Sequence, residues 1–374
     1  MTKIGRFVVD GHIHGSTLYR SAGKPKEGEE TITAKLWSEI EPYDNSDMIL
    51  YDMDAYGVDM GILKPSFPGT LNEMQTQIVD KYPNRFRALC SDQTLRLKSI
   101  RGEAEWNIKD ALDEIESALK WGKGKFVGIG EFAPGGMQVV RKRPTYEQRL
   151  EEFLAIAELA EKYDISLDFH EYHLPTMGWW GAGAHEGLSL ISEVASRYPK
   201  VRIILCHGGG QYPEDIRVTC EVVGMMENLY LETGYWRAEH YEIALKHPNV
   251  GATKLIWGGG DTGSSLWTHF PTQPGAKYLN PTGFGFQTKW PIPMPYQPDW
   301  LGWPIHQIHR LKDLELATQD EINLIVGGNA AKVFKLPVPM DRMFACGRPD
   351  LSGVHWEKTI PFLPKEQIQK PGTP

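Results

Sequence analysis

The sequence has few cysteines and no cysteine motif. Only four occur in 374 residues, at Cys90, Cys206, Cys220 and Cys346, and no two of them form a CxxC pair. Such scattered thiols do not provide a disulfide framework, and they are typical of reduced, buried cysteines in the cytoplasm. We therefore expect a cytoplasmic protein whose stability comes from its core.

Three other features are missing: a membrane-spanning segment, a signal peptide and a basic run. No apolar stretch reaches the roughly 18 residues that a membrane-spanning helix needs. The first residues, MTKIGRFVVDGHIHG, lack the apolar segment and small-residue cleavage site of a signal peptide. The formal charge is −8, and lysine and arginine form no run, so a nucleic-acid partner is not expected. The predicted partner is a small-molecule substrate, with neither nucleic acid nor membrane.

Short apolar runs alternate with helical patterns along most of the chain. The predicted strands are 7–10, 58–64, 86–90, 126–129, 165–169, 201–206, 229–231 and 255–257. The predicted helices include 46–56, 72–81, 108–121, 146–163, 187–198, 213–226 and 237–246. Eight strands, each followed by a helix, favour an α/β fold in which a parallel sheet closes into a (β/α)8 TIM barrel. An open doubly wound sheet is the alternative, but no glycine-rich phosphate turn follows the first strand.

Two long segments interrupt this alternation. Residues 16–44 are polar and charged, and residues 262–312 are rich in Trp, Pro, Gly and Tyr. Loops of this length in a compact domain are usually functional or disordered. The chain is therefore predicted to contain one barrel domain over 1–335 with these two insertions, followed by a Pro-rich C-terminal extension over 336–374.

The most informative pattern is the pair His12 and His14 at the end of the first predicted strand. Alternate residues of a strand point to the same side, so His-x-His can direct two imidazoles at one point. Neutral imidazole is the commonest protein ligand for zinc, iron and manganese. The pair alone does not decide between a structural and a metal-binding role.

Other strand ends supply partners for these two histidines. In a barrel enzyme the C-terminal ends of the strands carry the chemistry. Ligand-type side chains stand at five such ends: His12 and His14, Glu131, His170, His207, and Asp261. Imidazoles and carboxylates together form a nitrogen and oxygen site for a divalent metal that activates water. Glu131 bears on the number of ions, because one carboxylate can bridge two metals.

Some neighbouring polar residues have a structural explanation as well as a functional one. Asp168 is predicted to point into the barrel one layer below His170 and to support a ligand by hydrogen bonding. His173 is more typical of a loop histidine than of a ligand. Glu232 could face the substrate or be paired within the protein. Arg20, Arg237 and Lys64 are candidates for binding a substrate carboxylate, and spacing does not distinguish between them.

Several segments together resemble the amidohydrolase superfamily, in the branch that contains aminocarboxymuconate-semialdehyde decarboxylase and the resorcylate-type decarboxylases. They are DGHIH, GVDMGILKP, YPNRFRALC, KFVGIGE, ILCHGGG, NLYLETG, KLIWGGGD and GGNAAKVF, spread over residues 6–335. The resemblance implies metal ligation by His12, His14, His170 and Asp261. It also implies that His207 is a ligand of a second metal or a general acid/base, and that Asp261 accepts a proton from metal-bound water.

The sequence departs from the decarboxylase branch in one respect that concerns the metal. That branch is typically mononuclear, whereas GIGEF with Glu131 is similar to the bridging glutamate of the TatD-like hydrolases. A set of His12, His14, Glu131, His170, His207 and Asp261 would hold two ions. A few relatives with such centres, the aminoisobutyrate and diterpenoid hydroxylases, use iron or manganese and oxygen.

We therefore expect a metal-dependent enzyme with one or two divalent ions, Zn, Mn or Fe. The first hypothesis is hydrolysis or non-oxidative decarboxylation of a small carboxylated, cyclic or aromatic substrate, with Asp261 and His207 as catalytic residues. The second is a dinuclear oxygen-dependent hydroxylase. The third is a non-catalytic subunit that supports a catalytic paralogue. A homodimer or a hetero-oligomer with a paralogous subunit is the expected assembly.

Overall fold

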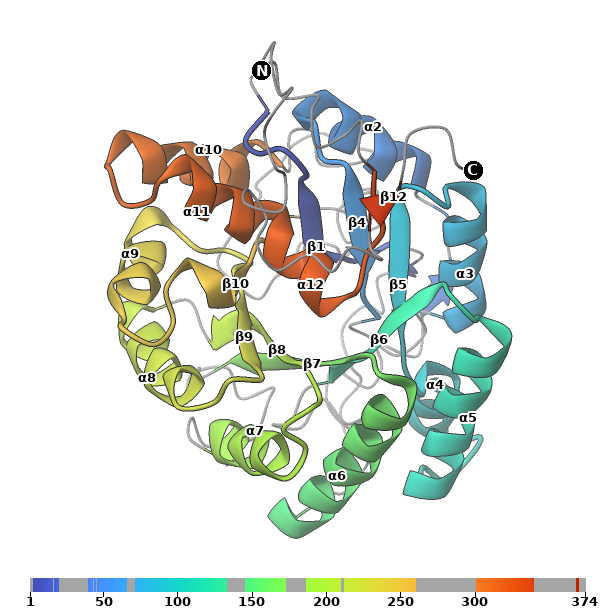
Figure 1. Ribbon diagram of the computed structural model, residues 1–374. Coiled ribbons are helices and arrows are strands. Elements are labelled where there is room, and N and C mark those ends of the chain that lie inside the picture. The colour runs from blue at the N-terminus through green and yellow to red at the C-terminus, as the bar shows by residue number, and fades with distance from the viewer. Residues whose placement is uncertain are drawn as a thin grey trace, which may run out of the picture.

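The fold is a ring of parallel strands surrounded by helices (Figure 1). The computed structural model describes residues 3–15, 17–19, 40–42, 44, 46–65, 71–132, 145–172, 186–209, 212–259, 301–339 and 368–369. Eight strands pair in the order β1-β4-β5-β6-β7-β8-β9-β10, and every pairing between them is parallel. Their bounds are Val9–Ile13, Met60–Leu63, Phe86–Cys90, Phe126–Phe132, Ser166–Tyr172, Ile203–Gly209, Leu229–Glu232 and Leu255–Ile256.

The two ends of this sheet meet and nearly close the barrel. The Gly11 N–H donates to the Trp257 carbonyl, with 2.8 Å between nitrogen and oxygen. A Cβ at Gly11 would lie 2.9 Å from that same oxygen, so a residue without a side chain is required for the two strands to approach. The predicted (β/α)8 barrel is confirmed, and the open sheet is excluded.

Helices alternate with the strands and cover the outside of the barrel (Figure 1). They are α2 (Ser46–Tyr56), α3 (Asn72–Lys81), α4 (Gln93–Arg101), α5 (Ile108–Trp121), α6 (Tyr146–Tyr163), α7 (Glu186–Arg197), α8 (Pro213–Gly224), α9 (Ala238–Lys246), α10 (Gly302–Asp313), α11 (Gln319–Asn323) and α12 (Asn329–Val333). The described residues also include a 3-10 turn (Ala252–Lys254) and a π-helical turn (Leu324–Gly328).

Local sequence signals account for the helix ends that the sequence predicted well. The longest helix, α6, begins after Thr145, whose side chain accepts from the Gln148 N–H while Gln148 reaches back to the Thr145 N–H. This capping box satisfies two of the N–H groups that a helix start leaves without partners. Helix α8 has Pro213 in its first turn, where a missing N–H costs nothing.

Helices α4, α10, α11 and α12 have no counterpart among the predicted helices. Helix α4 follows β5, and its mixed apolar and charged residues give no clear helical period. Helix α10 occupies the end of the predicted 262–312 insertion. Its buried face, which includes Ile305, Ile308 and Leu311, has helical spacing that the neighbouring Trp and Pro residues obscure.

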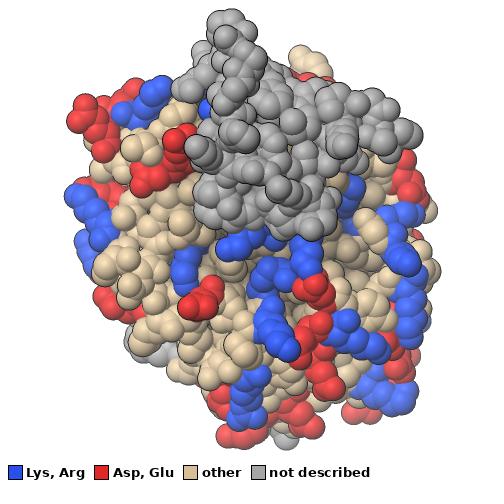
Figure 2. All heavy atoms as spheres, in the orientation of Figure 1, with Lys and Arg blue, Asp and Glu red and all other residues tan. Residues whose placement is uncertain are grey.

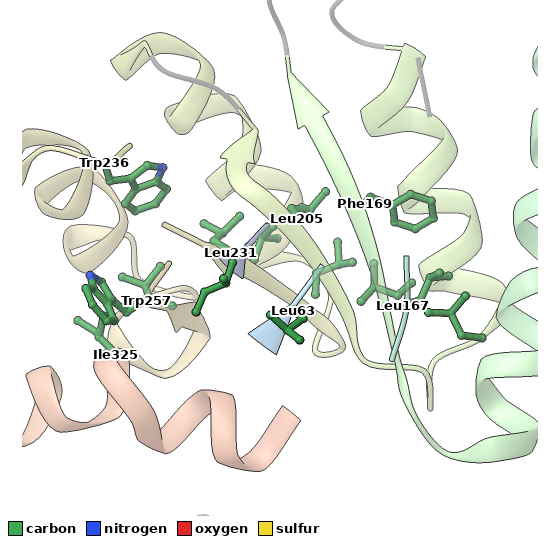
Figure 3. Close-up of a cluster of buried hydrophobic side chains, with 14 of the residues drawn as sticks. Leu63, Leu167, Phe169, Leu205, Leu231, Trp236, Trp257 and Ile325 are labelled. Atoms are coloured by element: carbon green, nitrogen blue, oxygen red, sulfur yellow. The ribbon is translucent and has the colours of Figure 1, made fainter. Parts of the chain in front are cut away.

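Alternation along each strand separates the barrel interior from the layer between strands and helices. In β4, Met60 and Ile62 belong to one apolar cluster and Leu63 belongs to the other. The outer cluster includes Leu63, Leu167, Phe169, Leu205 and Leu231, which Figure 3 shows with Trp236, Trp257 and Ile325. Successive side chains of a strand point to opposite faces. Lys64 therefore points to the barrel interior, as Met60 and Ile62 do, and away from the outer cluster that contains Leu63.

One end of the barrel interior is sealed by the C-terminal part of the fold. Val9, Ile62, Ile204 and Tyr230 form one apolar cluster with residues of α12 and the segment after it. The members from that C-terminal part are Ala330, Ala331, Val333, Phe334, Leu336 and Val338. Figure 1 shows α12 lying across this end of the strand ring. The polar site described below therefore lies at the opposite end, where the strands terminate.

The remaining described segments and the surface add little to the site. In the first insertion, β2 (Thr17–Tyr19) pairs antiparallel with β3 (Ile40–Pro42), and near the C-terminus β11 (Val338–Pro339) pairs with β12 (Ile368–Gln369). The predicted boundary at residue 335 stays a prediction. Figure 2 shows acidic and basic side chains interspersed on the face it presents. Among the described helices, none combines the length and the apolar character needed to cross a membrane.

Candidate metal centre

His12 in β1 and His14 just after it face each other across a short gap. Both side chains are buried, and their Nε2 atoms lie 3.1 Å apart. The Nδ1 of His12 lies 2.6 Å from a carboxylate oxygen of Glu232, and the Nδ1 of His14 lies 3.0 Å from the Lys64 carbonyl oxygen. A carbonyl oxygen or an ionised carboxylate can only accept, so each Nδ1 carries the hydrogen.

This hydrogen-bond pattern fixes what the two Nε2 atoms can do. In a neutral imidazole with a hydrogen on Nδ1, the Nε2 presents a lone pair. Two lone pairs 3.1 Å apart in a buried site repel unless a cation lies between them. A metal ion or a proton satisfies that requirement, and metal-binding histidines usually have this arrangement of the second nitrogen.

Glu131 brings a carboxylate to the same point and to a second one. Its Oε2 lies 3.2 Å from the His12 Nε2 and 4.0 Å from the His14 Nε2. Its other oxygen, Oε1, contacts the His170 Nδ1 and lies 4.0 Å from the His207 Nε2. The carboxylate therefore stands between two pairs of histidines, with one oxygen directed at each pair.

The four histidine rings form a compact group around this carboxylate. The ring centres of His12 and His207 are 4.8 Å apart, and so are those of His170 and His207. His170 comes from β7 and His207 from β8, at the ends of adjacent strands. Strands that are neighbours in the sheet thus bring together residues that lie far apart in the sequence.

The distances fit the binding of a divalent ion. Ligand atoms at about 2.1 Å from one ion are separated by at most about 4.2 Å. The His12 Nε2, His14 Nε2 and Glu131 Oε2 meet this limit, with separations of 3.1, 3.2 and 4.0 Å. The ligand atoms of His12, Glu131 and His207 form a second, looser group, within 4.8 Å of one another.

The balance of buried charge points the same way. Four carboxylates are buried around the site among the described residues, and one buried ammonium lies with them, that of Lys64. The carboxylates are those of Asp10, Glu131, Asp168 and Glu232. Buried charges are strongly unfavourable unless paired or bound to metal. The excess of negative charge makes this end of the barrel a site for cations.

The pKa values of two of these carboxyls are low for an identifiable reason. Burial alone raises the pKa of Glu131, but His12 and His170 outweigh it and hold the pKa well below its usual range. Burial likewise raises the pKa of Glu232, and His12 outweighs it and brings the pKa to about 2. Both groups are therefore carboxylates at neutral pH, as metal ligation and ligand support require.

Glu232 supports the site from behind His12. Its Oε2 also accepts from the His207 N–H at 3.2 Å, and its Oε1 accepts from the Gly234 N–H. A Cβ at Gly258 would lie 1.6 Å from the Glu232 Oε1, so the glycine at that position makes room for the carboxylate. Asp10 acts similarly on the backbone, accepting from the N–H groups of His12 and Gly259 at 3.1 and 2.8 Å.

Lys64 lies in the layer below the histidines and is already engaged. Its Nζ lies 2.9 Å from the Asp168 Oδ2 and donates to the Cys206 sulfur at 3.1 Å. Burial lowers the pKa of Lys64, but nearby negative groups outweigh it and hold the pKa well above its usual value. Burial raises the pKa of the Cys206 thiol, so the His12, Cys206 and Glu232 cluster is a weaker metal site than the one around Glu131.

The structure thus brings together His12, His14, Glu131, His170 and His207. Asp168 pairs with Lys64 rather than facing these ligands, and Glu232 pairs with His12. Asp261 and His173 lie outside the described residues. Arg20 also lies outside them, Arg237 is exposed beside Glu239, and the pairing of Lys64 makes it unsuitable for a substrate carboxylate.

Sequence reasoning did not foresee the supporting roles of several residues. Lys64 follows directly after the apolar run GIL. A charged residue at the end of such a strand could have indicated a functional side chain inside the barrel. Asp10 directly precedes GHIH, and its role in binding backbone N–H groups has no sequence signal. Tyr235, whose ring stacks on that of His207, is placed by a left-handed backbone conformation and had no sequence signal either.

Comparison with known proteins places the chain in a family. The amidohydrolase family model matches residues 9–336, and no curated protein sequence matches the chain. An amidohydrolase from Burkholderia multivorans with bound zinc is 12% identical, with coverage of 88% of this chain and 100% of that one and a TM-score of 0.51.

Two further solved structures are similar to this fold. An uncharacterised TIM-barrel protein from Bordetella bronchiseptica is 14% identical, with coverage of 88% and 98% and a TM-score of 0.51. A 2,6-dihydroxybenzoate decarboxylase in complex with 2,6-dihydroxybenzoate is 17% identical, with coverage of 88% and 98% and a TM-score of 0.50. Identities this low support the barrel fold alone. The match over residues 9–336 establishes more: the chain belongs to the amidohydrolase family.

Proposed function

We propose that this protein is a hydrolase that acts through two divalent metal ions bridged by Glu131. The observation that carries the proposal is the position of its carboxylate, with Oε2 toward His12 and His14 and Oε1 toward His170 and His207. A carboxylate that served a single ion would have no need of a second pair of imidazoles. Two divalent ions also offset the excess negative charge of the buried carboxylates.

The residues around the centre have separate roles in this proposal. Bound ions would polarise a carbonyl group and lower the pKa of water, so that hydrolysis proceeds at neutral pH. His12 and His14 are held in the tautomer that presents Nε2, by Glu232 and by the Lys64 carbonyl respectively. Lys64 neutralises Asp168 and leaves Glu131 available for the ions. His207 and Asp261 remain the candidates for moving a proton.

For the substrate, we propose a small carboxylated compound that is cyclic or aromatic. The support is the resemblance to the decarboxylase branch and the fold shared with a decarboxylase that binds 2,6-dihydroxybenzoate. Decarboxylation is the related reaction at a site of this kind. The two-sided position of Glu131 favours hydrolysis over it, because the decarboxylases of that branch use one ion.

Elemental analysis of protein purified without added metal tests this proposal. We expect two ions per chain, zinc or manganese, and hydrolysis of a carboxylated cyclic ester or amide in a substrate screen. One ion per chain together with carbon dioxide release would replace the hydrolase by a decarboxylase. Metal-free protein reloaded with each ion in turn is the matched control, since activity should return with the ion.

An oxygen-dependent hydroxylase is the second candidate, and the same bridging position of Glu131 supports it. Imidazole and carboxylate ligands suit iron and manganese as well as zinc. Here the expected result is two ions per chain that include iron, with oxygen consumed in proportion to product. Oxygen electrode measurements on the iron-loaded and the zinc-loaded protein distinguish the two candidates.

A further inference from the structure

Tyr235 and His207 share an unusual backbone conformation and stack on each other. Their φ angles are +64° and +59°, in the left-handed region that bulky residues rarely adopt. Their rings are nearly parallel, with an angle of 22° and 5.3 Å between centres. Such conformations persist where surrounding structure enforces them, and they concentrate at functional sites.

The short segment Glu232–Trp236, which we name the β9 clamp, holds His207 at its backbone as well. The His207 N–H donates to the Glu232 Oε2 at 3.2 Å, and the His207 carbonyl accepts from the Trp236 Nε1 at 2.9 Å. The backbone of His207 is therefore fixed on both sides by one segment of five residues.

The β9 clamp is held by its own hydrogen bonds and leaves room for the histidine ring. The backbone N–H of Trp236 donates to the Thr233 carbonyl in a tight turn. The Thr233 and Tyr241 hydroxyl groups form a hydrogen bond of 2.7 Å. A Cβ at Gly234 would lie 2.7 Å from the His207 Nδ1, so only glycine permits the ring to occupy this place. The segment is thus shaped around the imidazole of His207.

We propose that Tyr235 is a positioning residue that orients the His207 imidazole toward the Glu131 Oε1 as a ligand of the second ion. The inference rests on the proposed two-metal function. The hydrogen bonds to the His207 backbone fix the position of its Cα. They do not fix the rotation of the imidazole ring about the side-chain bonds. The stacked phenol ring, nearly parallel to the imidazole, limits that rotation.

A titration of metal-free full-length protein with Co²⁺, followed by calorimetry and visible absorption, tests the proposal. Tyr235→Gly removes the ring while glycine accepts the left-handed backbone. Tyr235→Phe keeps the ring without the hydroxyl. Glu315→Gly is the matched control, because Glu315 is exposed and also has a left-handed φ, +53°.

We expect two ions in the unsubstituted protein, in Tyr235→Phe and in Glu315→Gly. In Tyr235→Gly the first ion should bind unchanged and the second about 10–100-fold more weakly, the usual cost of losing an outer support of a metal ligand. If Tyr235→Gly does not fold, Tyr235→Asn replaces it, because asparagine also tolerates this backbone.

Three outcomes overturn the inference, and they can be told apart. A second ion that binds Tyr235→Gly as tightly as the unsubstituted protein removes the role of Tyr235 alone. A second ion lost equally from Tyr235→Phe assigns the effect to the hydroxyl and ends the stacking proposal. A single ion in the unsubstituted protein overturns the two-metal function, and this inference with it.

Discussion

The two ends of the barrel interior are built from the same strands in opposite ways. At one end Val9, Ile62 and Ile204 pack with α12 in an apolar layer. At the other end the same strands, or the positions just after them, provide His12, Lys64 and Cys206, which are buried polar groups at the candidate metal centre. Burial of apolar side chains stabilises the folded protein at one end, whereas burial of charged groups destabilises it at the other.

The comparison teaches that strand alternation decides whether a side chain points into the barrel interior. The position along the strand then decides whether that side chain lies in the apolar layer or in the charged one. The step of two residues from Ile62 in β4 to Lys64, just after the strand, passes from the apolar layer to the charged one. The apolar end should therefore respond to substitution through stability only. The charged end should respond through metal content, pH dependence and stability together.

The largest effect is expected for Glu131→Gln at the charged end. An amide keeps the shape but has one oxygen and no charge, so it cannot bridge two cations. We expect metal content to fall from two ions per chain to one or none, with loss of activity, measured by elemental analysis. Asp164→Asn, at an exposed ion pair with Arg202, is the control and should keep both ions. Unchanged metal content in Glu131→Gln would end the bridging assignment.

Lys64→Met should cost stability at the same end, by about 3–5 kcal/mol, because it leaves the buried Asp168 carboxylate without its partner. Urea unfolding of the metal-free protein measures this loss. The double variant Lys64→Met/Asp168→Leu should recover much of it, since no unpaired charge then remains. Equal losses in the single and double variants would contradict the pairing.

The pH dependence of stability should involve Glu232. Its pKa in the folded protein is about 2, below the unfolded value of 4.5, so its contribution is present above pH 4.5 and is lost as the pH falls toward 2. Glu232→Gln should reduce the slope of unfolding free energy in this window by about 1.4 kcal/mol per pH unit. Urea unfolding of metal-free protein from pH 5 to pH 3 measures it, and an unchanged slope would refute it.

The smallest effect is expected for Ile204→Val at the apolar end. Removing one methylene from this fully buried side chain should cost about 0.5–1.5 kcal/mol and leave metal content unchanged. Unfolding and elemental analysis of the same preparation check both statements. A loss of metal in Ile204→Val would show that the two ends of the interior are coupled, contrary to the comparison.

Some helices and site residues could be predicted from the sequence, and others could not. The bounds of α2, α3, α5 and α6 follow from the sequence, because apolar spacing and capping residues are local signals. The grouping of His12, Glu131, His170 and His207 also follows, since all stand at strand ends and a barrel brings such ends together. Helix α4 was missed because its stability comes from buried contacts rather than from its own residue pattern.

What the sequence determined by itself was periodic or local: the order of strands and helices, the barrel, the family, and the residues at its active end. Only the tertiary structure decided which nitrogen of each histidine faces the centre, that Glu131 stands between two histidine pairs, and that Lys64 is committed to Asp168. These depend on contacts between residues up to 220 positions apart, as between His12 and Glu232. Distances and hydrogen-bond partners across strands are properties of packing, and no local pattern encodes them.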